Sequence, residues 1–388
     1  MQSPYLQNTN FMLYCGKIEK RGRAVKIIHT GDIHLGSALR NLPMDKANIR
    51  KAELMESFRR LCTYAKQNSV AAVLIAGDLF DENKTSESVR REAFAAMQAA
   101  SPVCFFYVSG NHDDGLYFDG EIPANLYLFS KNHGWQSYDL PEGITVTGID
   151  GKNISPDKYA ELYLRADRFN FVLMHGDIRR GESGQRGANE EISLAKLQNR
   201  NIDYLALGHI HIPMVQAARL DGRGMYRYCG CLEGRGFDEV GARGFFLLEI
   251  VGGRLQKDSF VSFAKRQTTE CAVDISACTN YYEVERAVLD GMNGVRRDDM
   301  VKIILKGRHC VGLRKDVTVL AARIAQYFFH AKIVDESRIY IDYTAFQNDL
   351  SERGEFVREV GRYEMSEEER AEILDVGLKA LAGESIDL

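Results

Sequence analysis

The sequence predicts an α/β fold in which helices cover mainly parallel strands. Three apolar runs rich in β-branched or aromatic residues, at 25–29, 70–76 and 103–108, alternate with segments of helical spacing at 49–67 and 86–99. This order implies right-handed crossovers and parallel neighbouring strands. Polar residues follow each run directly, and open α/β sheets bind their ligands at the carboxyl ends of strands. We therefore expect a functional site at this edge of the sheet.

Further strands are expected downstream. The sequence indicates strands at 144–148, 169–173 and 202–207, with a helix at 156–168 before the second of them. Residues 214–220 and 225–229 flank Asp221-Gly222, a hairpin signal. Together with a strand at 244–250, they are expected to complete a second sheet.

Length and composition favour several domains. A chain of 388 residues that is 45% apolar and 27% charged can form two or three cores. We expect a loosely ordered extension at 1–23, a catalytic domain at 24–260, an α+β capping domain at 267–345 and an acidic helical tail at 351–388. In the capping domain, strands are expected at 271–275, 300–305 and 338–343, and helices near 282–289 and 317–329. The apolar residues of the tail would pack on their own protein or be offered to a partner helix.

Charge and cysteine content restrict the partners and the compartment. The net charge of -4 arises in the acidic tail, so a basic nucleic-acid surface must be local. The eight cysteines match neither a zinc knuckle nor a disulfide framework, which favours a reducing, cytoplasmic location. No apolar run approaches the roughly 18 residues of a membrane helix, so no membrane partner is expected.

The polar residues at the predicted strand ends form a candidate metal site. A lone Asp-x-His is more often a turn acid beside a capped helix, but here five of the nine histidines lie at four strand ends. Imidazole, carboxylate and amide ligands without thiolate favour manganese, iron or zinc, and their number implies two divalent ions sharing a carboxylate. The set is Asp32, His34, Asp78, Asn111, His112, His175, His209 and His211.

The reaction indicated is phosphodiester hydrolysis by metal-bound hydroxide. The sequence contains no Gly-x-Ser-x-Gly elbow, reactive-cysteine motif or Walker loop. The motifs that covalent catalysis and nucleotide-driven transfer require are therefore missing. Two ions would activate a shared water and stabilise the charge on the phosphate. His112 would protonate the leaving oxygen, oriented by Asp113 or Asp114, or would alternatively be a further metal ligand.

Arginines offer contacts for phosphate groups. Arg179, Arg180 and Arg186 lie in a glycine-containing loop after His175, and Arg235 lies further along the chain. The loop is either a solvated connector or a phosphate-contacting segment, because guanidinium forks suit phosphate oxygens.

The motifs carry a family resemblance. Asp32-x-His34, Gly77-Asp78, Gly110-Asn111-His112-Asp113, His175 and Gly208-His209-x-His211, in this order, resemble the complete signature of the calcineurin-like metallophosphoesterases. Within that superfamily the chain is most similar to SbcD-type DNA-repair nucleases, on residues 30–36, residues 233–239 and a capping-sized domain after the core. The resemblance implies a four-layer αββα sandwich, manganese dependence, exonuclease or endonuclease activity on DNA, an SbcC-type coiled-coil ATPase partner and a homodimer.

The resemblance also implies roles for individual residues. One ion would be bound by Asp32, His34 and His211. The other would be bound by Asn111, His175 and His209, with Asp78 bridging the two and His112 stabilising the transition state. Some relatives have histidine where this chain has Asp81, which we interpret as the cap of the next helix.

Two other functions compete with a DNA nuclease. The same metals could serve a small nucleotide or phospholipid-type ester, which the near-neutral core favours because a duplex binder should present a basic face. Alternatively, the fold could be a metal-poor scaffold for protein binding, which the intact set of ligand residues argues against.

Overall fold

The computed structural model divides the chain into two compact units. It describes residues 24–81, 85–113, 122–129, 134–150, 155, 157–178, 191–310, 313, 315–340, 346 and 348–383. The first unit ends at Gln267 and the second begins at Thr268. Predictions for residues 1–23 and for Arg179, Arg180 and Arg186 therefore lie outside the described residues.

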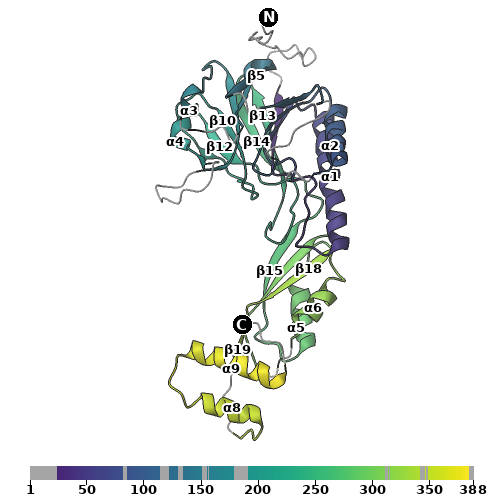
Figure 1. Cartoon of the computed structure of the whole chain (residues 1–388), viewed down its shortest axis with the longest axis vertical. Coiled ribbons are helices and arrows are strands. Elements are labelled where there is room, and N and C mark those ends of the chain that lie inside the picture. The colour runs from purple at the N-terminus through teal and green to yellow at the C-terminus, as the bar shows by residue number, and fades with distance from the viewer. Residues whose placement is uncertain are drawn as a thin grey trace, which may run out of the picture. The chain divides into compact units, whose positions relative to one another are not determined.

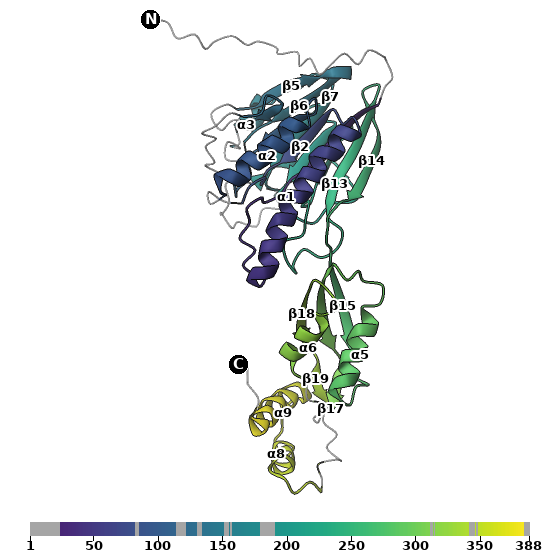
Figure 2. The same cartoon turned by 90° about the vertical axis from the view of Figure 1, so that its right-hand side faces the viewer.

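The first unit contains a six-stranded sheet that carries the amino-terminal motifs. Its strand order is β14-β13-β1-β2-β3-β4. The parallel strands are β1 (Val25–Thr30), β2 (Ala72–Ala76), β3 (Cys104–Val108) and β4 (Leu126–Leu128). The antiparallel edge is formed by β13 (Gly244–Val251) and β14 (Arg254–Ser262). Two helices, α1 (Met44–Gln67) and α2 (Glu87–Ala99), cover the outer face of this sheet (Figure 2).

A second six-stranded sheet supplies the remaining strand ends. Its order is β11-β12-β10-β7-β6-β5. The strands are β5 (Gln136–Leu140), β6 (Ile144–Gly148), β7 (Phe169–His175), β10 (Tyr204–Gly208), β11 (Ala218–Arg219) and β12 (Met225–Tyr228). The 3-10 turn η1 (Pro141–Gly143) joins β5 to β6. Short helices α3 (Lys158–Glu161) and α4 (Leu194–Leu197) cover its outer face, and β8 (Asp177–Ile178) pairs with β9 (Glu191–Ile192) beside it.

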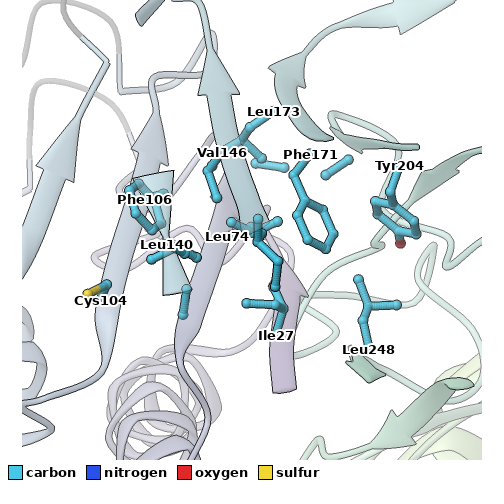
Figure 3. Packing of buried hydrophobic residues seen from close by; sticks show 14 of the residues in the cluster. Ile27, Leu74, Cys104, Phe106, Leu140, Val146, Phe171, Leu173, Tyr204 and Leu248 are labelled. Carbon is cyan, nitrogen blue, oxygen red and sulfur yellow. The ribbon is translucent and has the colours of Figure 1, made fainter. Parts of the chain in front are cut away.

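The two sheets pack face to face around one apolar core. Leu74 and Phe106 from the first sheet pack in one cluster with Phe171, Leu173 and Tyr204 from the second (Figure 3). All five residues of β2 and all seven of β7 are buried because helices cover the other face of each sheet. The layers are therefore helix, sheet, sheet, helix (Figure 1), which confirms the predicted α/β class.

Three details of the first unit differ from the sequence predictions. The helix expected at 156–168 is the single turn α3, because side chains of Asn170 and Asn201 bond the carbonyls of Arg165 and Leu164 and hold this segment non-helical. The predicted hairpin exists but is short. Strand β13 joins the first sheet, against β1, and not the second, since alternation of apolar residues does not specify which sheet a strand enters.

The second unit is an α+β domain followed by two helices. Its three-stranded parallel sheet has the order β15-β16-β18, from β15 (Thr268–Asp274), β16 (Met300–Lys306) and β18 (His330–Asp335). Helices α5 (Tyr281–Gly291) and α6 (Val317–Ile324) pack on it, and β17 (Arg308–Cys310) pairs with β19 (Arg338–Tyr340). The helix expected to reach residue 329 ends at Ile324, and β18 was not predicted.

The acidic tail is helical but interrupted. It contains α8 (Glu352–Val360) and α9 (Glu367–Ala382), whose buried residues Val357, Val360, Leu374 and Leu378 form a small core of their own. Ser366 and Glu369 form a capping box that starts α9. Among the residues described, no helix combines the length and apolar character that a membrane crossing requires.

Candidate metal centre

Four of the predicted ligands adopt a left-handed backbone. The φ angles are 47° at Asp32, 51° at His34, 49° at Asp78 and 103° at His209. A left-handed conformation costs a non-glycine residue about 1–2 kcal/mol. Such residues cluster at functional sites, where the surrounding structure enforces them. Here backbone bonds enforce them, since Asp32 N donates to the Gly77 carbonyl at 3.0 Å and His34 N to the Asp78 carbonyl at 2.9 Å.

Glycines let these loops approach one another closely. A Cβ atom at Gly77 would lie 2.1 Å from His175 Nδ1, and one at Gly208 would lie 1.8 Å from the Ala76 carbonyl oxygen. A Cβ at Gly110 would lie 2.1 Å from Asp78 Oδ1. Glycine is thus required where strand ends meet, between the two sheets at Gly77 and Gly208 and within the first sheet at Gly110. This explains the Gly-Asp, Gly-Asn-His and Gly-His sequences.

One candidate metal-binding cluster contains Asp32, His34 and His211, whose ligand atoms all lie within 4.8 Å of one another. His34 Nε2 is 3.2 Å from His211 Nε2, and His211 Nε2 is 3.9 Å from Asp32 Oδ1. Burial lowers the pKa of His34 to about 3. His34 is therefore a neutral imidazole, the form that binds metal ions.

A second cluster contains Asp32, Asp78 and His175. His175 Nδ1 is 2.9 Å from the Ala76 carbonyl, which only accepts, so Nδ1 carries the proton and Nε2 keeps its lone pair. That Nε2 lies 3.0 Å from Asn111 Oδ1 and 3.5 Å from Asp78 Oδ2. The structure thus brings Asn111 to the same place, as the sequence predicts.

His209 lies beside this second cluster. Its ring centroid is 5.2 Å from that of His175, and its backbone N–H donates to both Asp32 oxygens at 3.0 and 3.1 Å. Within the described residues, its side chain is not part of a three-ligand group. The predicted ligands therefore converge, with His209 at the edge of the convergence.

The charges of the site fit divalent cations. Burial and the neighbouring Asp78 carboxylate raise the pKa of Asp32 well above its usual range, and burial also raises the pKa of Asp78. Two adjacent buried carboxylates would be costly without a compensating cation. A pair of divalent ions supplies that charge, and the donor set suits first-row transition metals.

Asp81 has a different place from the one predicted. Its Oδ1 lies 3.2 Å from His34 Nδ1 and 2.9 Å from His112 Nδ1. The interpretation of Asp81 as a helix cap is wrong, because the cap of α2 is Ser86, which accepts from Val89 N. Asp81 raises the pKa of His112, against the opposing effect of burial.

Asp113 supports the backbone of the site and does not orient His112. Its carboxylate accepts from Gly110 N at 2.5 Å, from Leu79 N at 2.8 Å and from the hydroxyl of Tyr107. Burial raises its pKa to about 6. The described carboxylate next to His112 is therefore Asp81, and a catalytic role of Asp113 stays a prediction. Asp114 lies outside the described residues.

Glu239 was not predicted as a site residue. Its Oε1 is 2.5 Å from His211 Nδ1, and its Oε2 accepts from Arg235 N at 2.5 Å. Although burial favours the neutral acid, His211 and Arg235 hold the pKa of Glu239 at about 2. A carboxylate on the far nitrogen of a ligating histidine fixes its tautomer and ring orientation. The only sequence signal for Glu239 was its place in residues 233–239, which contribute to the family resemblance.

An open groove of about 370 Å³ adjoins the site. Residues 36–41 line one part of it, and Asp81, His112, Arg235 and Glu239 line another. The Arg235 guanidinium lies 3.7 Å from Asp81 Oδ1 and 3.3 Å from His211 Nδ1. Of the predicted phosphate-contacting arginines, Arg235 is therefore beside the site, whereas the other three are outside the described residues.

Comparison with known proteins identifies the domain. Residues 25–213 match the family model of the calcineurin-like phosphoesterases. The chain is 26% identical to the uncharacterized metallophosphoesterase YhaO of Bacillus subtilis, over 72% of this chain and 71% of the relative. It is 24% identical to a subunit of the nuclease SbcCD of Staphylococcus epidermidis, over 61% and 69%. It is 25% identical to the DNA double-strand break repair protein Mre11 of Aeropyrum pernix, over 77% and 75%. The chain therefore contains a calcineurin-like metallophosphoesterase domain and is a metal-dependent phosphoester hydrolase.

Proposed function

We propose that the chain is a manganese-dependent DNA nuclease of DNA repair that works in the cytoplasm with an SbcC-type ATPase. The observation that carries the proposal is the convergence of two ligand clusters and His112 beside an open groove. Relatives named as part of a nuclease and as a double-strand break repair protein support DNA as the substrate. Six cysteines are free thiols, in keeping with a reducing compartment: Cys62, Cys104, Cys229, Cys231, Cys271 and Cys278.

The proposed ligand assignment follows the clusters. Asp32, His34 and His211, which form the first cluster, would hold one ion. Asp78, whose Oδ2 lies 3.7 Å from His34 Nε2 and 3.5 Å from His175 Nε2, would be shared between the two. Asn111, His175 and His209 would hold the other. When bound, the two ions supply Lewis acidity toward water and phosphoryl oxygens.

His112 is the proposed acid and transition-state stabiliser. Its side chain is 36% exposed and lines the groove, whereas its Nδ1 faces Asp81. A carboxylate on Nδ1 orients the ring and leaves Nε2 to donate a proton to the leaving oxygen of the substrate. Arg235, at the same groove, would contact a phosphate oxygen.

The test is digestion of linear DNA with Mn²⁺, with and without the cognate ATPase. We expect degradation by the wild type, and loss of turnover with full metal content in His112→Ser. His330→Ser, a histidine substitution in the second unit, serves as the matched control and should digest DNA normally. Loss of metal in His112→Ser would instead make His112 a ligand.

A small phosphodiester is the second candidate substrate. The groove volume falls in the range of about 300–1,000 Å³ that is typical of small-molecule sites. Outside the acidic tail the chain is also nearly neutral. A panel of cyclic nucleotides, dinucleotides and head-group phosphodiesters, assayed beside DNA, separates the two. Cleavage of small esters alone would refute the nuclease proposal.

A further inference from the structure

A buried ionic network lies apart from the metal ligands. Arg50 and Glu53 come from α1, Glu233 comes from the loop after β12, and Arg266 is in the last residues of the first unit. Arg50, Glu53 and Glu233 are only 1%, 3% and 1% exposed. Buried ion pairs add little net stability compared with apolar residues of the same size, so their position needs another explanation.

The network has two arms that meet at Arg50. In the first arm, Arg50 Nη2 donates to Glu233 Oε2 at 2.9 Å and to the Gly234 carbonyl at 2.6 Å. In the second arm, Arg50 Nη1 donates to Glu53 Oε2 at 2.6 Å, and Arg266 Nε donates to both Glu53 oxygens at 2.9 Å. The first arm touches the backbone of the loop that leads to Glu239, through the Gly234 carbonyl.

Glu233 is held from three sides. Besides Arg50, the Ser57 hydroxyl donates to its Oε1 at 2.6 Å, and Lys265 N also donates to it. A carboxylate with this many donors is fixed in orientation. Glu233 and the Gly234 carbonyl therefore anchor the start of the loop to α1.

The same loop carries the carboxylate that contacts His211. One residue after Gly234, the backbone N–H of Arg235 donates to Glu239 Oε2, and Glu239 Oε1 faces His211 Nδ1 at 2.5 Å. The path from Arg50 to the His211 ring thus consists of direct hydrogen bonds, the peptide unit between Gly234 and Arg235, and the Glu239 carboxylate. A shift of the anchored end would move the acceptor that sets the orientation of His211.

We propose that Arg50 and Glu233 are positioning residues for the metal centre, because they fix the loop whose Glu239 orients His211. The inference rests on the proposed assignment of His211 as a metal ligand, and it is independent of DNA as the substrate. In chemical terms, the anchored loop holds the imidazole with Nδ1 on Glu239 and Nε2 toward the site, so Mn²⁺ does not have to order it.

The test measures Mn²⁺ affinity of the full chain by calorimetry. The charge-balanced double variant Arg50→Met/Glu233→Gln removes the first arm and the Arg50–Glu53 bond, and leaves Glu53 paired with Arg266. Its matched control, Glu53→Gln/Arg266→Met, removes the same charges from the second arm and leaves an acceptor for Arg50. We expect an affinity loss of about 10–100-fold in the first double variant, the range seen when partners of ligating histidines are removed. We expect wild-type affinity in the control.

Hydrolysis of bis(p-nitrophenyl) phosphate supplies a second measurement. Because the ligands themselves remain, excess Mn²⁺ should restore the rate of Arg50→Met/Glu233→Gln toward that of the wild type. Glu239→Gln, at the end of the same path, should show the same affinity loss and the same rescue. If the network only stabilised the fold, excess Mn²⁺ would not restore the rate, and Glu239→Gln would not share the affinity loss of the double variant.

The outcomes are distinguishable. Wild-type affinity in the folded Arg50→Met/Glu233→Gln variant, or an equal loss in both double variants, would overturn the proposal. If that variant does not fold, the single variant Glu233→Gln is measured instead and must bind Mn²⁺ more weakly than the wild type. Wild-type Mn²⁺ affinity in Glu233→Gln would also overturn the proposal. Wild-type affinity in His211→Ala would mean that the ligand assignment itself is at fault. Failure to cut DNA would affect only the nuclease proposal.

Discussion

Replacement of Gly77 by alanine tests how the fold places His175. Gly77 has a φ of +87°, and a Cβ there would lie 2.1 Å from His175 Nδ1 and 2.5 Å from its Cγ. The ring must therefore move, which breaks its bond to the Ala76 carbonyl at 2.9 Å. This perturbation acts on a proposed ligand without changing any ligand residue.

The expected magnitude has two parts. The left-handed backbone costs alanine about 1–2 kcal/mol relative to glycine. Loss of the His175 bond adds about 0.5–1.5 kcal/mol. For a unit of this size, 1 kcal/mol corresponds to a Tm shift of about 2–4 °C. The displaced ring should also lower the affinity for Mn²⁺ by about 10–100-fold, as for other losses of ligand orientation.

Gly143→Ala is the matched control. Gly143 has a φ of +75°, but a Cβ there would meet no atom within 4 Å. The control should therefore show only the backbone part of the Tm shift and bind Mn²⁺ normally. Thermal unfolding of the metal-free protein and calorimetric titration with Mn²⁺ measure the two quantities. Equal Mn²⁺ affinity in Gly77→Ala and Gly143→Ala would refute the assignment of His175 as a ligand held by this contact.

Three further predictions concern both units. Asp78→Ala should lose both ions, and full occupancy by metal analysis would contradict the bridging role. Leu374→Ala, in the buried face of α9, should cost about 2–5 kcal/mol of unfolding free energy of the second unit, seen in denaturant unfolding, without changing phosphodiester hydrolysis. Although burial opposes it, contact with Lys315 and Ser337 lowers the pKa of Asp335. Its stabilisation is therefore present above the unfolded pKa of about 4 and is lost as pH falls through the folded value. The stability difference between wild type and Asp335→Asn should shrink on acidification, and a constant difference from pH 6 to pH 3 would contradict this.

The parallel strands and the convergence of most proposed ligands were predictable because both depend on local patterns. Continuous apolar runs mark strands buried on both faces, and a polar residue directly after such a run marks a strand end. Asp32, Asp78 and His175 were found in this way, and the structure brings their ligand atoms together. Strand β13 was placed in the wrong sheet because the identity of its partner, β1, depends on contacts far away in sequence.

The residues that were misjudged act through contacts that no local pattern records. Asp81 precedes a helix and so resembles a cap, yet its side chain turns to His34 and His112. Asp113 adjoins His112 in sequence, but its oxygens are used by Gly110 N and Leu79 N. Sequence adjacency therefore identified the loop, but it could not reveal that Asp81 is also a carboxylate partner of His112.

The strain of the ligand loops links metal binding to folding. Four left-handed residues at about 1–2 kcal/mol each would weaken the site by several kcal/mol if nothing compensated them. Backbone bonds between the loops, such as Asp32 N to Gly77 O, compensate in part, but the carboxylates of Asp32 and Asp78 remain buried with like charge. Ions that bind only the folded loops stabilise them by mass action. We therefore expect Mn²⁺ to raise the Tm of the first unit. The increase should be smaller in Gly77→Ala, because this variant should bind Mn²⁺ more weakly and binding offsets the cost of the strained loops.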